Sequence, residues 1–119
     1  MTQTRPWPTE MTFMREARAL HIKFDSGESF DIPFELLRVQ SPSAEVRGHR
    51  AGDEKLIAGK SGVGVREAQP VGRYAVRIVF DDGHDSGLYT WDYLHELGRE
   101  RAARMMSYEA AIARAGLSR

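Results

Sequence analysis

The segment from Tyr74 to Leu97 constrains the fold more than any other stretch, because it predicts two strands, a tight turn and a helix start. From Val76 to Phe80, apolar residues recur at every second position, as in a strand with one buried face. Asp82-Gly83 is typical of a hairpin turn, since glycine adopts positive φ angles at little cost. Thr90 is suited to cap the following helix, whose apolar stripe contains Trp91, Leu94 and Leu97. We expect Trp91 to be largely buried, so that its replacement by alanine costs about 3 to 5 kcal/mol.

An earlier segment predicts the same order of elements. A strand is expected over residues 20–24, a turn over 25–28, then a return strand and a helix that starts at Pro33. Pro33 aligns with Thr90, and the second unit has one additional residue near its turn. The match reflects either an internal repeat or only the shared chemistry of hairpins and helix starts. In both cases the sequence predicts a small two-layer α+β domain, an antiparallel sheet of hairpins with short helices on one face and a C-terminal helix.

The flanking segments complete the predicted organisation. Residues 1–10 are interpreted as a flexible arm with Trp7 packing back, residues 11–98 as the domain, and residues 99–119 as a C-terminal helical tail rich in alanine. Ser107 is suited to cap a second helix within the tail. The apolar stripe of the tail contains Met105, Tyr108 and Ile112. This stripe either packs on the sheet or binds a partner.

The composition excludes several functions. The chain of 119 residues has the length of one domain and contains no cysteine, which removes thiolate metal sites, disulfide exchange and cysteine nucleophiles. Its 17 basic and 17 acidic residues leave no net charge to attract nucleic acid. No apolar run reaches the roughly 20 residues of a membrane span, and no secretion signal is visible. We therefore expect a cytoplasmic protein that binds neither nucleic acid nor membrane.

Motifs for catalysis or cofactor binding are incomplete. Gly59-Lys60-Ser61 resembles the end of a phosphate-binding loop, but Glu54 stands in the place of its first glycine. Gly62-Val63-Gly64 lacks the third glycine of a dinucleotide fingerprint, since Glu67 is there instead. No serine has the context G-x-S-x-G, and no histidine has an acid two places on, as an iron triad would need. The sequence therefore predicts no enzyme and no cofactor.

The long polar segment between the two units is the predicted working surface, together with the hairpin tip of the second unit. Residues 40–62 are rich in serine, glycine and charge, and long loops in compact domains often carry function. The candidate binding residues are Ser41, Ser43, Glu45, Arg47, Gly48, His49, Asp82, His84 and Asp85.

These residues also have simpler interpretations. His49 and His84 are candidate metal ligands, since loop tips can bring imidazoles and carboxylates together, but aspartates also favour turns for backbone reasons. Arg47 either grips a carboxylate or phosphate of a partner or pairs with an aspartate of the hairpin tip. His21 and His95 are interpreted as solvated surface groups.

Two long motifs resemble a known family. The segments 37–49 (LRVQSPSAEVRGH) and 80–94 (FDDGHDSGLYTWDYL) look like the small bacterial proteins of the DUF971 family, a domain of unknown function, and the similarity extends from about Met11 to Gly98. That domain is similar to the N-terminal domain of γ-butyrobetaine hydroxylase and trimethyllysine hydroxylase. It also occurs attached to P-loop ATPases of the iron–sulfur cluster carrier type.

The resemblance implies a binding domain rather than a catalytic one. In those hydroxylases the iron and 2-oxoglutarate site lies in a separate domain absent from this sequence, whereas the N-terminal domain holds a structural zinc through three cysteines and a histidine. The cysteine segment corresponds to the region around Ser41 and Ser43, where hydroxyls are poor zinc ligands, and His84 stands where the zinc histidine stands. We therefore expect a non-catalytic accessory domain that binds a protein partner in iron–sulfur or iron-enzyme biology. The alternative is a module in which His49, His84 and nearby carboxylates hold iron or zinc weakly.

Overall fold

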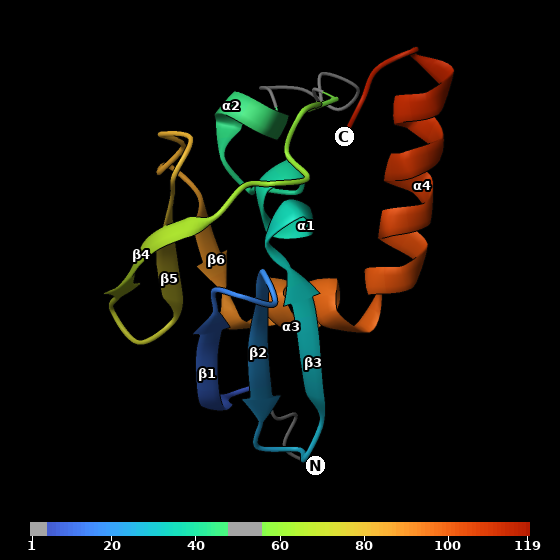
Figure 1. Cartoon of the computed structure of the whole chain (residues 1–119). Coiled ribbons are helices and arrows are strands. Elements are labelled where there is room, and N and C mark those ends of the chain that lie inside the picture. Colours follow the sequence, from blue (N-terminus) through green and yellow to red (C-terminus); the bar gives the residue numbers. More distant parts are fainter. Residues whose placement is uncertain (1–4, 48–55) are drawn as a thin grey trace.

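The computed structural model describes residues 5–47 and 56–119 of the chain (Figure 1). The strands are β1 (Pro8–Met14), β2 (Ala19–Phe24), β3 (Ser29–Pro33), β4 (Val65–Val71), β5 (Ala75–Phe80) and β6 (Leu88–Thr90). The helices are α1 (Phe34–Val39), α2 (Ala44–Arg47), α3 (Trp91–Arg99) and α4 (Arg101–Arg114). Two units with the same order of elements follow one another, β1-β2-β3-α1 and β4-β5-β6-α3.

The strands form two antiparallel sheets of three strands each, with the orders β1-β2-β3 and β4-β5-β6. In the first sheet Leu20 lies opposite Ile32, and in the second Ala68 lies opposite Ile78. The predicted α+β class is confirmed, although the expected antiparallel sheet is divided into two. β2 and β5 are the middle strands, which is why the clearest alternation in the sequence falls on them.

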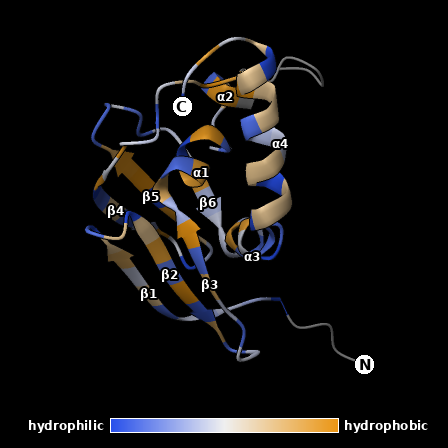
Figure 2. Cartoon of the chain, turned by 45° about the vertical axis from the view of Figure 1, so that its right-hand side comes forward, coloured by the Kyte–Doolittle hydropathy of each residue, from blue (hydrophilic) through white to orange (hydrophobic). Residues whose placement is uncertain are grey.

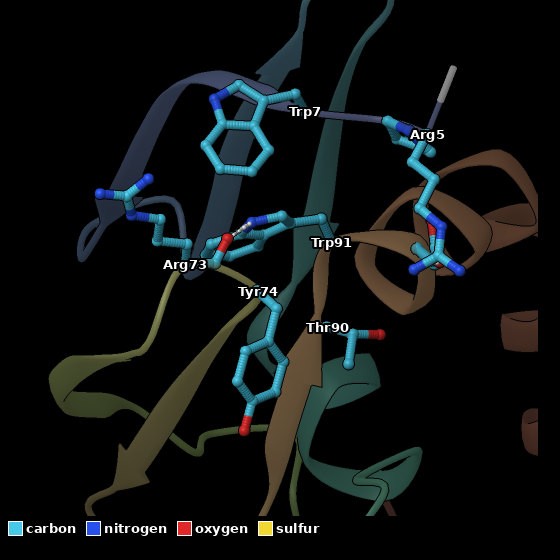
Figure 3. A pocket seen from close by; sticks show the side chains of 8 residues that line it. Arg5, Trp7, Arg73, Tyr74, Thr90 and Trp91 are labelled. Carbon is cyan, nitrogen blue, oxygen red and sulfur yellow. Dashed lines mark hydrogen bonds and ion pairs between the residues drawn. The ribbon is translucent and has the colours of Figure 1, made fainter. Parts of the chain in front are cut away.

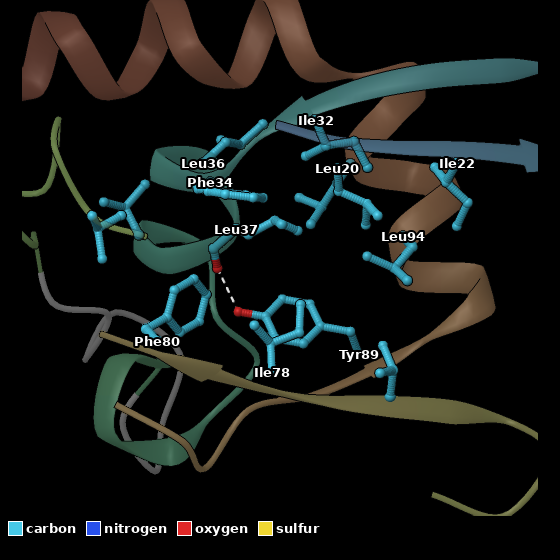
Figure 4. Packing of buried hydrophobic residues seen from close by; sticks show 14 of the residues in the cluster. Leu20, Ile22, Ile32, Phe34, Leu36, Leu37, Ile78, Phe80, Tyr89 and Leu94 are labelled. Atoms are coloured by element: carbon cyan, nitrogen blue, oxygen red, sulfur yellow. Dashed lines mark hydrogen bonds between the residues drawn. The ribbon is translucent and has the colours of Figure 1, made fainter. Parts of the chain in front are cut away.

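The core lies where the two sheets meet α1 and α3 (Figure 4). Apolar residues recur along β2, β3, β5 and α1 (Figure 2). The largest fully buried side chains come from both units: Leu20, Ile22, Phe24, Ile32, Phe34, Leu36, Leu37, Ile78, Phe80, Tyr89, Leu94 and Leu97. The hydroxyl of Tyr89 donates to the backbone carbonyl of Leu37, so that β6 of the second unit is joined to α1 of the first. Neither unit covers its apolar residues alone.

The two units share one turn geometry. Gly27 and Gly83 both have a φ angle of 94°, a value that favours glycine. The backbone N–H of Phe24 donates to the carbonyl of Glu28 at 2.8 Å, and that of Phe80 donates to the carbonyl of His84 at 2.9 Å. Glu28 and His84 therefore occupy the same position of the turn, and the additional residue of the second unit comes after it.

The residue at this turn position contacts the opposite unit in both cases. Glu28 Oε1 lies 2.8 Å from Nε2 of His95 on α3, whereas His84 contacts the segment that follows α1. His95 also packs edge-on against Phe24 and Phe30, with ring centroids 5.1 and 5.6 Å apart. The expectation that His95 is a solvated surface group is therefore wrong, because two aromatic rings and a carboxylate surround it.

The C-terminal helix packs within the molecule. Tyr108 and Ile112 are buried, and the helix packs mainly on α1 and α3, while Arg101 at its start donates to the carbonyl of Asp31 in β3 at 2.8 Å. The Tyr108 hydroxyl donates to Glu35 at 2.9 Å, and Arg119 donates to both oxygens of that carboxylate at 2.7 and 3.0 Å. The bonds from Arg119 hold the pKa of Glu35 below its ordinary value, and burial raises the pKa of Tyr108 to about 12. The stripe therefore packs within the molecule, but mainly against the helices α1 and α3 and not on a sheet as the first interpretation had it.

Two local predictions were wrong. β1 begins at Pro8, so residues 8–10 belong to a strand rather than to an arm. α4 runs without interruption through Ser107, because the alanines around that residue favour helix over a new cap. Trp91 is buried over most of its surface, as predicted, with its indole at the margin of the core, where Nε1 donates to the carbonyl of Arg73 at 2.8 Å. In the described part of the chain, none of the helices is long and apolar enough to cross a membrane.

Candidate functional site

Ser41 and His84 form the centre of a buried polar cluster. Their exposed fractions are 0% and 6%. Ser41 Oγ lies 2.9 Å from Nε2 of His84, a contact that joins the segment after α1 to the turn after β5. The ring of Phe80 lies against the imidazole, with centroids 6.1 Å apart. The expected exposed position of His84 at a hairpin tip is therefore wrong, because the turn folds the side chain inward.

Two further residues of the predicted surface support this contact. Ser43 Oγ accepts the backbone N–H of Glu45 at 3.2 Å in the first turn of α2, and it lies 2.7 Å from Oγ of Ser86. Glu45 Oε2 lies 3.3 Å from Nδ1 of His84, and the side chain of Glu45 is 70% exposed. The segment 41–45 and the loop 84–86 are thus tied together by side chains from both.

Asp82 is held by donors from three segments. Arg38 Nε and Lys60 Nζ approach Oδ2 at 2.8 and 2.6 Å, and the backbone N–H of His84 donates to Oδ1 at 3.0 Å. Burial alone would raise the pKa of Asp82, but the bonds from Lys60, His84 and Arg38 outweigh it and hold the pKa well below its usual range. Among the described residues, Arg38 Nη1 is the one buried side-chain nitrogen or oxygen without a hydrogen-bond partner. Asp82 is therefore a charged anchor between α1, the segment before β4 and the turn.

The protonation of His84 follows from its surroundings. Burial, and then the charge of Arg38, lower the pKa of His84, while Glu45 and Asp82 oppose that shift. The imidazole is therefore neutral at pH 7, with one N–H to donate. Because a carboxylate only accepts, Nδ1–H donates to Glu45, and Nε2 accepts the hydroxyl hydrogen of Ser41.

These contacts have the order of a serine hydrolase triad, in which a hydroxyl, an imidazole and a carboxylate follow one another. A nucleophile must reach the carbonyl of a substrate, and Ser41 is fully buried. Gly87 leaves no room above it, since a Cβ atom there would lie 2.5 Å from Ser41 Oγ. The arrangement therefore cross-links two loops and does not present a nucleophile.

The same residues do not fit the zinc site that the resemblance implies. Ser41 and Ser43 offer hydroxyls in the region of the thiolates, and both hydroxyls are engaged in hydrogen bonds inside the cluster. Within residues 5–47 and 56–119, no group of three or more His, Cys, Asp or Glu side chains is arranged to hold a metal ion. In this chain, hydrogen bonds connect the segment 41–45 with the loop 84–86, which the zinc of the implied site would connect.

The remaining predicted residues lie elsewhere. Asp85 is exposed and pairs with Arg77 at 3.3 Å, outside the buried cluster. Gly48 and His49 lie outside the described residues, as does the side chain of Arg47. The predicted residues that the structure brings together are Ser41, Ser43, Glu45, Asp82 and His84.

Sequence reasoning missed three members of the cluster, Arg38, Lys60 and Ser86. Arg38 is 44 positions from Asp82, and no local pattern links residues so far apart. Lys60 was noticed only as part of an incomplete phosphate-binding motif. One sequence feature could have indicated Arg38 and Lys60. Several carboxylates lie close together in the turn near position 82, and a carboxylate that is removed from solvent needs a cation from another segment.

A second region of interest was not predicted as a site. Trp7, Tyr74 and Trp91 line a cavity of about 250 Å³, with Arg5 and Arg73 at its sides (Figure 3). The exposed fractions of Trp7 and Tyr74 are 49% and 56%. The rings of Trp7 and Trp91 meet edge to face, with centroids 6.4 Å apart and an interplanar angle of 78°, so Trp7 packs back as expected. We call this region the aromatic cavity.

The fold and the buried cluster together define a class, a small α+β domain of two sheet–helix units whose connecting loops are tied through a central histidine. Residues 11–95 match the family described as gamma-butyrobetaine hydroxylase-like, N-terminal. The chain belongs to this family, which confirms the resemblance that the two motifs predicted.

Several solved structures are similar over most of the chain. One solution structure determined by NMR is 43% identical to this chain and superimposes on it with a TM-score of 0.85. The match covers 98% of this chain and 91% of the chain in that structure. A second is 44% identical, with coverage of 100% and 90% and a TM-score of 0.83. The crystal structure of a protein of unknown function from Acidithiobacillus ferrooxidans, assigned to the DUF971 family, is 35% identical, with coverage of 76% and 91% and a TM-score of 0.65. No curated protein matches the chain.

Proposed function

We propose that this chain is a non-catalytic binding domain that recognises a protein partner. The observation that carries the proposal is the aromatic cavity, in which Trp7 and Tyr74 remain 49% and 56% exposed beside the mostly buried Trp91. Tryptophan, tyrosine and arginine dominate the binding energy of protein interfaces, and all three surround this cavity. Large aromatic rings left open on a small domain favour an interaction surface over a solvent-exposed face.

The buried cluster supports a non-catalytic role. Its hydroxyl and imidazole groups bond to one another, and Ser41 is closed off by Gly87. The residues that the sequence suggested for binding thus divide into a scaffold, centred on Ser41 and His84, and exposed carboxylates at its rim, Glu45 and Asp85. The rim carboxylates are exposed although each already has one partner in the chain, and the scaffold fixes the loops that carry them.

The family resemblance suggests the biological setting of this binding. The implied occurrence of such domains attached to iron–sulfur cluster carriers, or ahead of an iron-dependent hydroxylase domain, supports a role beside iron-handling proteins. We propose the same setting here, with the domain acting as an accessory that holds a partner rather than the iron.

Metal binding is the second candidate function. It is favoured by one observation, the contact of 3.3 Å between Nδ1 of His84 and Glu45, which places an imidazole and an exposed carboxylate together. A metal ion between Nδ1 and Glu45 would require the proton of the imidazole to move to Nε2, so that the buried hydroxyl of Ser41 would have to turn and accept it instead of donating. This cost makes the binding of a protein partner the better supported proposal.

The test is recovery of a partner and its rebinding to matched variants. Protein purified at low salt from the cell that makes it is expected to retain a stoichiometric partner, which mass spectrometry identifies and which is then purified alone. Rebinding should be lost with Tyr74→Ser and kept with Leu88→Ser, which removes another exposed apolar side chain, one that is 41% exposed. Absence of any retained partner, or the binding of stoichiometric iron or zinc instead, would contradict the proposal.

A further inference from the structure

We propose that the aromatic cavity receives an extended acidic segment of the partner, which inserts one bulky apolar side chain or proline between Trp7, Tyr74 and Trp91. This inference rests on the proposed function and adds the place of docking and the chemistry of the docked segment. In Figure 3 the three rings lie in a row, with Arg73 on one side and Arg5 on the other.

Hydrogen bonds to backbone carbonyls fix the positions of the segments that line the cavity. Trp91 Nε1 donates to the carbonyl of Arg73 at 2.8 Å, and the backbone N–H of Trp91 donates to the carbonyl of Tyr74 at 3.2 Å. The carbonyl of Trp7 accepts the N–H of Asp25 at 2.9 Å, which attaches this segment to the end of β2. The rings are therefore positioned before any ligand arrives, which lowers the entropic cost of binding.

The size of the cavity selects the kind of ligand. Cavities for cofactors and drug-sized ligands measure roughly 300 to 1,000 Å³, whereas this one is about 250 Å³. It suits one side chain of a longer segment better than a whole small molecule. Aromatic-lined grooves of this type bind extended segments, including those that contain proline.

The charges around the cavity decide between an acidic ligand and a cation. Three aromatic rings could surround a quaternary ammonium group, but the lining contains Arg5 and Arg73 against a single carboxylate, Asp92. Arg5 and Asp92 are 3.9 Å apart and exposed, and no carboxylate in the described part of the chain pairs with Arg73. The excess positive charge repels a cation and favours carboxylates on both sides of the inserted residue.

Intrinsic fluorescence reports on this cavity directly, because both tryptophans of the chain, Trp7 and Trp91, line it. The probe is a short synthetic peptide with a central Leu-Pro-Phe flanked by aspartates. One control peptide replaces its aspartates with lysines, and a second replaces its central residues with serines. A fourth titration uses tetramethylammonium chloride.

The aspartate peptide is expected to shift the tryptophan emission in a saturable way that weakens with added salt. Both control peptides should bind at least about tenfold more weakly, since one loses the charge contacts and the other loses the inserted side chain. Arg73→Gln should weaken the aspartate peptide about threefold and Tyr74→Ser about tenfold, while Leu88→Ser leaves it unchanged. Equal binding of the lysine peptide, or saturable binding of tetramethylammonium, would overturn the proposal.

The outcome is separable from that of the proposed function. If the purified partner binds the wild type and also Tyr74→Ser and Trp7→Ala, the domain is a binding domain but docking takes place elsewhere. If Tyr74→Ser loses the partner while no aspartate peptide binds, the surface is correct and the acidic segment is wrong. If no partner exists, the proposed function fails irrespective of the peptide result.

Discussion

The regions at the two ends of β5 differ in which side chains they leave exposed to solvent. Beyond its C-terminal end, His84 is buried and the side chain of Asp82 is 18% exposed, and their polar atoms are bonded to neighbours from distant segments. Before its N-terminal end, Tyr74 and its neighbour Trp7 remain about half exposed, around a cavity that nothing in the described chain fills. The polar residues that resemble a catalytic or metal site form hydrogen bonds that hold the loops together. The aromatic rings of Trp7 and Tyr74, in contrast, keep exposed surface that a partner can contact.

The distance between these ends makes the comparison testable. A strand of six residues spans roughly 20 Å, well beyond the range at which substitutions normally couple. Substitutions beyond the C-terminal end should therefore change stability and leave binding unchanged, and those of the two exposed rings of the aromatic cavity, Trp7 and Tyr74, should do the reverse.

The largest expected effect is that of His84→Ala. The substitution leaves the fully buried hydroxyl of Ser41 without an acceptor for its hydrogen and opens a cavity beside Phe80, so we expect a loss of about 3 kcal/mol in the free energy of unfolding. Chemical denaturation measures it, with His21→Ala as the control at a partly exposed histidine. A loss below about 0.5 kcal/mol would mean that the cluster does not hold the loops.

Gly87→Ala is expected to cost slightly less, about 2 kcal/mol. The added Cβ atom would lie 2.5 Å from Ser41 Oγ and 3.0 Å from the buried ring of Tyr89, so Ser41 must move away from His84. Gly62→Ala is the matched control, because its nearest neighbour is the flexible end of Arg18 at 3.5 Å. Equal stability of the two variants would show that the space above Ser41 is not closed.

Trp91→Ala should cost about 2 kcal/mol, less than the value expected for a fully buried tryptophan. Part of the indole remains exposed, and the loss comes from its contact with the core and its hydrogen bond to Arg73. Tyr74→Ser, at the open side of the same cavity, should change stability by less than about 0.5 kcal/mol. Thermal unfolding of both variants measures the contrast, and a large loss for Tyr74→Ser would mean that the rings belong to the core.

Acidification should weaken the wild type through His84. Its pKa is lowered in the folded state, so the unfolded chain takes up the proton first, and stability falls as the pH drops below the ordinary value of 6.5. One proton gives a slope of at most about 1.4 kcal/mol per pH unit. The charged groups that face the ring are Arg38, Glu45 and Asp82. His84→Gln should show a shallower decline between pH 7.5 and 5.5, and identical slopes would contradict the buried, neutral imidazole.

The smallest expected effect is that of metal removal. Because hydroxyls stand where the zinc thiolates of the family are implied, a strong chelator should leave the melting temperature within about 1 °C of its untreated value. The same measurement on a relative that keeps its cysteines gives the contrast, since that protein should melt earlier after chelation. A drop in this chain would favour the metal-binding alternative.

The sequence predicted the local elements well because each depends on a short-range pattern. Alternation located β2 and β5, Thr90 indeed caps α3 by accepting the N–H of Tyr93 at 3.1 Å, and glycine marked both turns. The predicted recurrence of one unit was also useful, since it anticipated two turns with the same geometry. Such features involve residues close together in the chain.

The sequence could not predict which distant residues the polar side chains at the turns contact. Asp82 and His84 look like solvated tip residues by every local criterion. Only Ser41, from a distant segment, makes the burial of His84 favourable, and only Arg38 and Lys60 hold the carboxylate of Asp82 against the protein. The aromatic cavity was missed for the same reason. It is assembled from a segment before β1, a turn before β5 and the start of α3, and no one of them suggests a surface alone.

The exchange of contacts at the two turns has a consequence for the architecture. Glu28 of the first unit reaches His95 on the helix of the second, and His84 of the second reaches Ser41 beyond the helix of the first. A reciprocal exchange of this kind is the signature of an isologous dimer, in which each subunit gives its partner what it receives. The chain thus resembles a homodimer with its two subunits joined end to end.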